Sequence, residues 1–321
     1  VRFGAEMLFE TARIWPQIGF FNEERGGRFC INMVTGPDEY TALVNNNLYT
    51  NVMAKAHLLK AVEAVAHLKS QHPDDFARLV EKLNLSDDEI SLWRKAAEQM
   101  ELAYDEKRQL FLQDDRFLER KIWDFANTPD NKYPLLLHYA PLEIYRHQVC
   151  KQADAVLAAF LQKAQFAEAD RKRIFDYYES VTVHDSTLSP CVFSTVAADV
   201  GELDKAVYYL TQSALVDIED LHGNASHGVH MASSGGSWMA LINGFAGMEV
   251  NGSDLSFAPK FPNDWAGYEF RLRYQDRILE LCVDQNHTTY RLIEGESLPI
   301  RHCNEMHMLN PGQDLKLDLA P

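Results

Sequence analysis

The hydrophobic pattern changes its period near residue 251, and this change constrains the fold more than any other feature of the sequence. Before it, apolar residues recur at the spacing of amphipathic helices, as over 43–69. After it, three segments separated by turn residues alternate polar and apolar side chains: 269–274, 278–283 and 289–293. The sequence therefore predicts a mainly α domain over 1–251 and a small antiparallel β domain over 252–321.

Start and stop signals divide the first part into about nine helices joined by short connections. The first helix is expected to stop before Pro16, and another should begin at the capping box Ser86–Glu89. Pro141 suits a first helical turn, so a long helix is expected from there to Lys163. Four shorter helices are expected over 168–180, 189–200, 203–215 and 236–245.

Composition narrows the classes of partner. The chain has 47 acidic and 31 basic side chains and a net charge of −16, which disfavours nucleic acid and anionic membrane surfaces. It has no apolar run of ~20 residues, so no membrane span is expected. Its 5 cysteines are scattered and its histidines lack metal-ligand spacing. We therefore expect no disulfide framework, no metal and a cytoplasmic location.

The run Thr35–Tyr40 carries the strongest chemical signal. Its Gly-Pro turn presents Asp38 and Glu39 side by side, next to the ring of Tyr40. An amide-rich stretch, Val44–Asn51, follows and leads into a helix. Such a segment suits a carboxylic acid held beside a hydroxyl-rich ligand. The alternative is an ordinary helix start, where acidic residues are common because they oppose the helix dipole.

A second segment, 227–238, combines histidines, serines and glycines directly before a predicted helix. Backbone N–H groups at a helix N-terminus bind anions, and glycine allows a close approach. His230 would complete a phosphate cradle with the residues that follow. The segment has no lysine, so it is not a Walker-type loop. The alternative is again an ordinary helix start.

Two further motifs have weaker signals. Lys151-Gln152-Ala153-Asp154 falls in the middle of a predicted helix, where a solvated helix face is the simplest interpretation. His184-Asp185-Ser186 contains the residue types of a catalytic triad, but three neighbours in sequence point in different directions. Asp185 or Ser186 is therefore expected to cap the next helix.

Together these motifs resemble glycoside hydrolase family 65, the inverting α-glucoside phosphorylases that act on maltose, trehalose, kojibiose or nigerose. The match covers the run from Thr35 to Asn51, the Lys-Gln-Ala-Asp motif and the segment before Trp238. The resemblance implies that Glu39 is the general acid. It implies phosphate binding by His230, Ser233, Ser234, Gly235, Gly236 and His184, and substrate binding by Lys151, Gln152, Asp38 and Tyr40.

The resemblance also implies an architecture. Members of the family have an N-terminal β-sandwich, an (α/α)6 barrel and a C-terminal β-sheet domain. We expect this chain to begin partway through the barrel, so the N-terminal region of the same enzyme would be a missing partner. Inorganic phosphate would be a co-substrate, with no cofactor, and a homodimer is an assembly that the resemblance allows.

The implied reaction is phosphorolysis of an α-linked glucose disaccharide, with inversion, to β-glucose 1-phosphate and glucose. Many family members have His after the Tyr of this motif, whereas this chain has Thr41, which favours the kojibiose or nigerose branch. Two alternatives remain open. One is an inverting α-glucoside hydrolase of the same fold, similar to acid trehalase, with Asp185 as the base. The other is a sugar- or phosphate-binding protein without catalysis.

Overall fold

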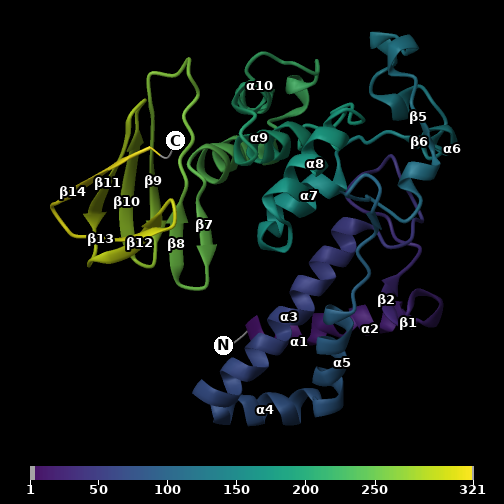
Figure 1. Cartoon of the computed structure of the whole chain (residues 1–321), viewed down its shortest axis with the longest axis horizontal. Coiled ribbons are helices and arrows are strands. Elements are labelled where there is room, and N and C mark those ends of the chain that lie inside the picture. The colour runs from purple at the N-terminus through teal and green to yellow at the C-terminus, as the bar shows by residue number, and fades with distance from the viewer. Residues whose placement is uncertain (1–3, 320–321) are drawn as a thin grey trace. The chain divides into compact units, whose positions relative to one another are not determined.

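A computed structural model describes residues 4–319, with helices in the first part of the chain and β-sheets in the last (Figure 1). This order confirms the predicted succession of a mainly α region and a small β region. The chain divides into two compact units, Val1–Asp185 and Ser186–Pro321, and each is described by itself. The predicted boundary between residues 251 and 252 falls inside the second unit and stays a prediction.

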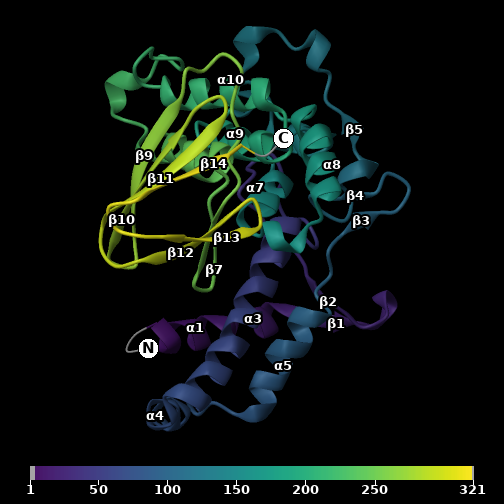
Figure 2. The same cartoon turned by 60° about the vertical axis from the view of Figure 1, so that its left-hand side comes forward.

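The first unit is built around the long helix α3, Leu48–Gln71 (Figure 2). Three helices share an apolar cluster with it: α1 (Gly4–Ala12), α4 (Pro73–Leu83) and α5 (Asp87–Glu98). The apolar side of α3, including Leu58 and Val65, lies in one cluster with Phe9 and Trp93, whose ring centroids are 6.0 Å apart. Burial of this apolar surface is the main force that holds the four helices together.

The rest of the first unit consists of shorter elements. The helices are α2 (Ile14–Ile18), α6 (Pro141–Ile144), α7 (Asp154–Leu161) and α8 (Glu168–Glu179). The strands form three pairs: β1 (Gly19–Asn22) with β2 (Arg28–Ile31), β3 (Tyr104–Asp105) with β4 (Leu110–Phe111), and β5 (Lys121–Ile122) with β6 (His147–Gln148).

The second unit begins with helices and ends in two four-stranded sheets. Its helices are α9 (Ser189–Asp199), α10 (Leu203–Ala214), α11 (Met231–Met239) and the π-helix Ala240–Phe245. One sheet has the order β14 (Asp314–Asp318), β11 (His287–Glu294), β10 (Arg277–Val283), β9 (Tyr268–Tyr274). The other has the order β13 (Glu305–Leu309), β12 (Leu298–His302), β8 (Asp254–Phe257), β7 (Glu249–Asn251).

The three predicted strands are confirmed as β9, β10 and β11. In β10, Leu279, Leu281 and Val283 are buried and alternate with more accessible residues, as period-two patterning requires. The region is not wholly antiparallel, because β12 pairs with β8 in parallel. No helix within residues 4–319 is long and apolar enough to cross a membrane. The cytoplasmic location stays a prediction.

The long helix predicted over 142–163 is wrong. Helix α6 ends at Ile144, and α7 begins only at Asp154. Between them the chain is extended: β6 pairs in parallel with β5, and Cys150 forms a bridge with Thr182. Backbone hydrogen bonds to distant segments therefore override the helical pattern of the apolar residues.

Helix boundaries also differ from prediction near the N-terminus. Pro16 lies inside α2, in its first turn, where a missing N–H costs nothing. Helix α3 begins at Leu48, about five residues later than the pattern indicated. The Ser86 cap is confirmed, since its Oγ accepts from the N–H of Glu89 at 3.1 Å. The Glu89 carboxylate does not complete the capping box and instead binds Arg13.

Candidate active site

Residues 35–41, called the acid loop here, present only one of their three chemically interesting side chains to solvent. The side chain of Glu39 is 60% exposed. Its two neighbours, Asp38 and Tyr40, have no exposed surface. Both were predicted to bind substrate, and their burial instead gives them contacts with the protein interior.

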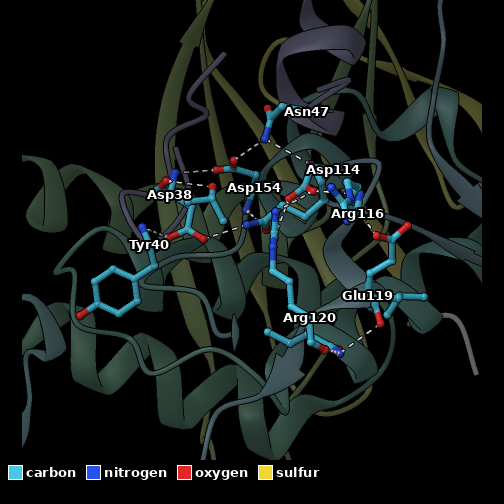
Figure 3. A network of polar contacts seen from close by, with 12 residues as sticks. Asp38, Tyr40, Asn47, Asp114, Arg116, Glu119, Arg120 and Asp154 are labelled. Carbon is cyan, nitrogen blue, oxygen red and sulfur yellow. Dashed lines mark hydrogen bonds and ion pairs between the residues drawn. The ribbon is translucent and has the colours of Figure 1, made fainter. Parts of the chain in front are cut away.

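The Asp38 carboxylate is held by three hydrogen bonds (Figure 3). Its Oδ1 accepts from the backbone N–H groups of Tyr40 at 3.1 Å and Lys151 at 2.9 Å. Its Oδ2 accepts from Nε2 of Gln113 at 2.8 Å. Burial raises the pKa of Asp38 to about 6, because removal from water disfavours the charged form.

A second buried carboxylate, Asp154, lies beside Asp38 in this network (Figure 3). Its Oδ1 accepts from the Asp38 N–H at 2.7 Å, and its Oδ2 accepts from Asn47 Nδ2 at 2.8 Å. Burial raises the pKa of Asp154 well above its usual range. Gly36 is required here, since a Cβ on it would overlap the Asp154 carboxylate and lie 2.7 Å from Asn47 Nδ2.

Lys151 and Gln152, predicted as substrate-binding residues, lie directly against the acid loop. The Lys151 Nζ forms an ion pair with Glu39. Gln152 Nε2 donates to the carbonyl of Pro37 at 2.8 Å. Both residues are in the extended segment before α7, whereas the sequence pattern placed them in the middle of a helix.

Tyr40 and Asp185 form a second support behind the acid loop. The Tyr40 hydroxyl donates to Asp185 Oδ2, and the N–H of Leu135 lies 2.9 Å from both of these oxygens. The Tyr40 ring points away from the Asp38 carboxylate (Figure 3). It lies in an apolar cluster with Trp123 and Ile144. Asp185 had been predicted as a possible cap of the next helix, but the N-cap residue of that helix is Leu188.

A backbone hydrogen bond of the preceding residue places His184 near Lys151. The N–H of Val183, the residue before it, donates to the carbonyl of Cys150 at 2.9 Å, next to Lys151. Burial lowers the pKa of His184 to about 4, so its imidazole is neutral near pH 7. Its φ of 55° is unusual for a residue other than glycine and is a conformation found at functional sites.

The predicted phosphate segment, 227–238, lies in the second unit. Helix α11 begins at Met231, five residues before the predicted start at Gly236, so the serines and glycines are inside the helix. His230 precedes the helix and is held by Asp217. The Asp217 carboxylate lies 2.6 Å from His230 Nδ1 and accepts the His230 N–H at 2.8 Å. The bond from His230 lowers the pKa of Asp217.

Two of the six predicted phosphate ligands are used for helix packing. Ser233 is buried, and its Oγ lies 3.0 Å from the Oγ of Ser213 on α10. Gly236 is buried where a Cβ would lie 2.7 Å from the Cβ of Cys191 on α9. Ser234 and Gly235 are exposed. Among the five residues predicted in this segment, Ser233 and Gly236 therefore hold the helix in place.

The next helix start also differs from prediction. Ser186 does not cap α9, because this helix begins at Ser189 with Leu188 as its N-cap residue, which makes no side-chain cap. The Ser186 Oγ instead accepts from the N–H of Leu188 at 3.3 Å, which closes a local turn.

Sequence reasoning missed four residues that position these groups. Asp154 belongs to the Lys-Gln-Ala-Asp motif and Asn47 to the amide-rich stretch, so the sequence motifs could have identified both residues. Gln113 and Asp217 have no local signal, because only the fold brings them to Asp38 and His230. Across residues 4–319, no three His, Cys, Asp or Glu side chains come together as a metal site.

Comparisons with known proteins identify the family of the chain. The family model described as the glycosyl hydrolase family 65 central catalytic domain matches residues 1–239, and the C-terminal domain of the same family matches residues 248–309. The chain is 49% identical over 315 residues to an α,α-trehalose phosphorylase of Geobacillus stearothermophilus, covering 98% of this chain and 41% of that protein. It is 42% identical over 311 residues to an α,α-trehalose phosphorylase of Thermoanaerobacter brockii, covering 97% and 40%.

A solved structure has the same fold. It is named a putative kojibiose phosphorylase from human microbiome, and it matches 98% of this chain and 41% of its own, with a TM-score of 0.88 and 27% sequence identity. The predicted fold class is thus confirmed. The chain spans about 40% of the length of the curated relatives it matches. It belongs to glycosyl hydrolase family 65, with the central catalytic domain followed by the C-terminal domain.

Proposed function

We propose that this chain carries the general acid of an inverting phosphorylase of α-linked glucose disaccharides. Glu39 gives its proton to the glycosidic oxygen as the bond from that oxygen to C1 breaks. A phosphate oxygen forms the new bond to C1 on the opposite face, which inverts the anomeric centre. The products are glucose and β-glucose 1-phosphate, and Glu39 regains a proton from water.

One observation carries this proposal. Glu39 is an exposed carboxylate between two buried, hydrogen-bonded neighbours, Asp38 and Tyr40. A general acid must reach its substrate while its backbone is held still, because small displacements of a reacting group cost large factors in rate. The ion pair with Lys151 places a cation beside the carboxylate in the free protein. We propose that substrate binding replaces this pair with contacts to sugar hydroxyls.

We assign phosphate binding to the accessible part of the segment 227–238. Asp217 orients the His230 ring through Nδ1, which leaves Nε2 for a phosphate oxygen. Ser234 and Gly235 are exposed within the first turns of α11, where the helix dipole favours an anion. His184 stays in this set as a neutral hydrogen-bonding group. Phosphate acts as a co-substrate and no cofactor is proposed.

For the substrate we propose α,α-trehalose ahead of kojibiose. The kojibiose preference rested on Thr41, which is 1% exposed and whose Oγ1 lies 3.5 Å from the carbonyl of Asp38. A residue in that position is too buried to select a leaving group by contact. The higher identity to trehalose phosphorylases then becomes the better guide. The homodimer and the additional N-terminal region stay predictions.

The rival hydrolase requires Asp185 to activate water. Asp185 Oδ2 already accepts from the Tyr40 hydroxyl and the Leu135 N–H. Using it as a base would disturb both bonds, so we prefer phosphate as the nucleophile. A protein without catalysis would have no need for an exposed acid on such a rigid support.

The test is cleavage of trehalose, kojibiose, nigerose and maltose by the enzyme, each with and without phosphate. We expect strict phosphate dependence, with trehalose the best substrate. Asp185→Asn separates the rivals: a hydrolase would lose its base and turnover together, whereas a phosphorylase would keep phosphate-dependent turnover at a reduced rate. Release of glucose without phosphate would overturn the proposal, and no turnover under any condition would favour a binding protein.

A further inference from the structure

We propose that Asp154 is a positioning residue for the general acid, acting through the backbone of the acid loop. This inference rests on the proposed role of Glu39. Asp154 does not contact Glu39; it accepts the N–H of Asp38, the residue immediately before the acid, at 2.7 Å. The Asp38–Glu39 peptide is therefore anchored at its first residue by a carboxylate that is itself fully buried.

Besides the ion pair between Lys151 and Glu39, the segment 151–154 makes three hydrogen bonds to the acid loop. The Lys151 N–H donates to the Asp38 carboxylate at 2.9 Å, and Gln152 Nε2 donates to the Pro37 carbonyl at 2.8 Å. Asp154 makes the third hydrogen bond, in which its side chain accepts from the backbone of the loop instead of donating to it. Three hydrogen bonds to two successive residues fix both the position and the orientation of the backbone that carries Glu39.

Asp154 also ties the acid loop to a rigid helix. Its second oxygen accepts from Nδ2 of Asn47, whose Oδ1 caps α3 by accepting the Thr50 N–H at 3.0 Å. The same Nδ2 lies 3.2 Å from the carbonyl of Gln113. Asn47 therefore cannot turn its amide over without losing the helix cap. These hydrogen bonds link the acid loop to α3, the longest helix of the first unit.

The contact requires a side chain with two oxygen acceptors. Asp154 accepts from two donors at once, one on each oxygen, and a neutral amide in its place would offer only one acceptor. In Asp154→Asn, either the Asp38 N–H or the Asn47 amide would face another donor in a buried site. A loss of this kind leaves an unsatisfied polar group, which is far more costly than an absent bond at the surface.

The first test separates positioning from general stability by the choice of leaving group. Fluoride departs from α-glucosyl fluoride with little need for a proton, whereas a sugar does need one. We expect Asp154→Asn to lower kcat for trehalose by about a hundredfold and kcat for the fluoride by less than about tenfold. The matched control is Asp114→Asn, a carboxylate of equal burial whose partners are Arg120 and the N–H of Arg116. It should change both substrates alike.

The second test is a rescue by exchange. In the double variant Asp154→Asn with Asn47→Asp, the amide at 154 can accept from Asp38 and donate to the carboxylate at 47. The new carboxylate can still cap α3, and the Gln113 carbonyl keeps the Leu48 N–H at 3.0 Å. We expect the double variant to recover at least about tenfold of the lost kcat, because the complementary pair is restored.

Amide hydrogen exchange tests whether Asp154 holds the acid loop without relying on the proposed reaction. Asp154→Asn should speed exchange in the peptide covering the acid loop and leave α8 unchanged, and the double variant should slow it again. Equal losses on trehalose and the fluoride, or no change in loop exchange, would overturn the inference. If the wild-type enzyme cleaves neither substrate, the proposed function fails, while the exchange result still decides whether Asp154 holds the loop.

Discussion

The acid loop and the segment 227–238 carry equally recognisable motifs, yet the structure uses them differently. In the acid loop, Asp38 and Tyr40 turn inward, and Glu39 between them stays exposed. In the second segment, Ser233 and Gly236 turn inward to pack helices, and the exposed residues include Ser234 and Gly235 together with large apolar side chains such as Met231. A motif therefore combines groups that bind ligands with groups that hold those groups in place, and burial distinguishes the two.

The largest expected effect is on catalysis by the acid loop. Glu39→Gln should lower kcat for disaccharide phosphorolysis by about a thousandfold, because a general acid contributes factors of 10² to 10⁴. The Tm should change little, since the side chain is 60% exposed. Steady-state kinetics with a thermal melt of the same sample checks both. Retained activity would remove Glu39 from the mechanism.

The second effect contrasts a buried with an exposed polar residue. Asp38→Ala leaves the N–H groups of Tyr40 and Lys151 and the amide of Gln113 without their acceptor. We expect a loss of about 3 kcal/mol or more in the free energy of unfolding. Ser234→Ala, at an exposed site, should stay within about 0.5 kcal/mol of wild type. Urea unfolding of both variants measures the difference, and equal losses would contradict it.

The third prediction is that Asp38, in the acid loop, and Asp217, beside His230, change the free energy of unfolding with pH in opposite directions. The pKa of Asp38 is raised from 3.8 to about 6, so the folded state binds its proton more tightly. Its contribution to stability is present below pH 3.8 and is lost as pH rises through about 6. The pKa of Asp217 is lowered, so its contribution is present above 3.8 and is lost as pH falls.

The measurement is urea unfolding from pH 3.5 to 7 for wild type, Asp38→Asn and Asp217→Asn. The stability advantage of wild type over Asp38→Asn should decline between about pH 4 and 6. The advantage over Asp217→Asn should stay constant above about pH 4 and decline only at the acidic end of the range. Parallel slopes for the two variants would mean that the two carboxylates are in similar environments.

The smallest effect concerns two neighbouring glycines of α11. Gly236→Ala places a Cβ against Cys191, which should cost about 1–3 kcal/mol of stability. Gly235→Ala enters open space within a helix and should stabilise by up to about 1 kcal/mol. Thermal unfolding distinguishes the two. If this segment binds phosphate, Gly235→Ala should also raise the KM for phosphate while leaving the KM for trehalose unchanged.

Much of the fold could be predicted because local chemistry agreed with the tertiary structure. The alternation in 278–283 became strand β10, and Ser86 became an N-cap. Where long-range hydrogen bonds competed, the local pattern failed. The backbone at Cys150 and Lys151 bonds to Val181 and Asp38, so the apolar residues there could not continue a helix.

The candidate site was predictable to the extent that its motifs are contiguous. Glu39, Lys151 and Gln152 were identified from short strings and do lie together. Gln113 could not be, because its partner Asp38 is 75 residues away and nothing in the neighbouring sequence marks it. Burial of Asp38 was also invisible, since an acidic residue in a turn is normally exposed.

The most direct test of the account is the anomeric configuration of the glucose 1-phosphate formed from trehalose. Proton NMR measures the coupling between H1 and H2 of the product. The phosphate ester at C1 prevents mutarotation, so this coupling reports the anomer that the enzyme formed. The account predicts β-glucose 1-phosphate, formed only when phosphate is present. The α anomer, or free glucose without phosphate, would contradict a single-step inverting reaction with Glu39 as its acid.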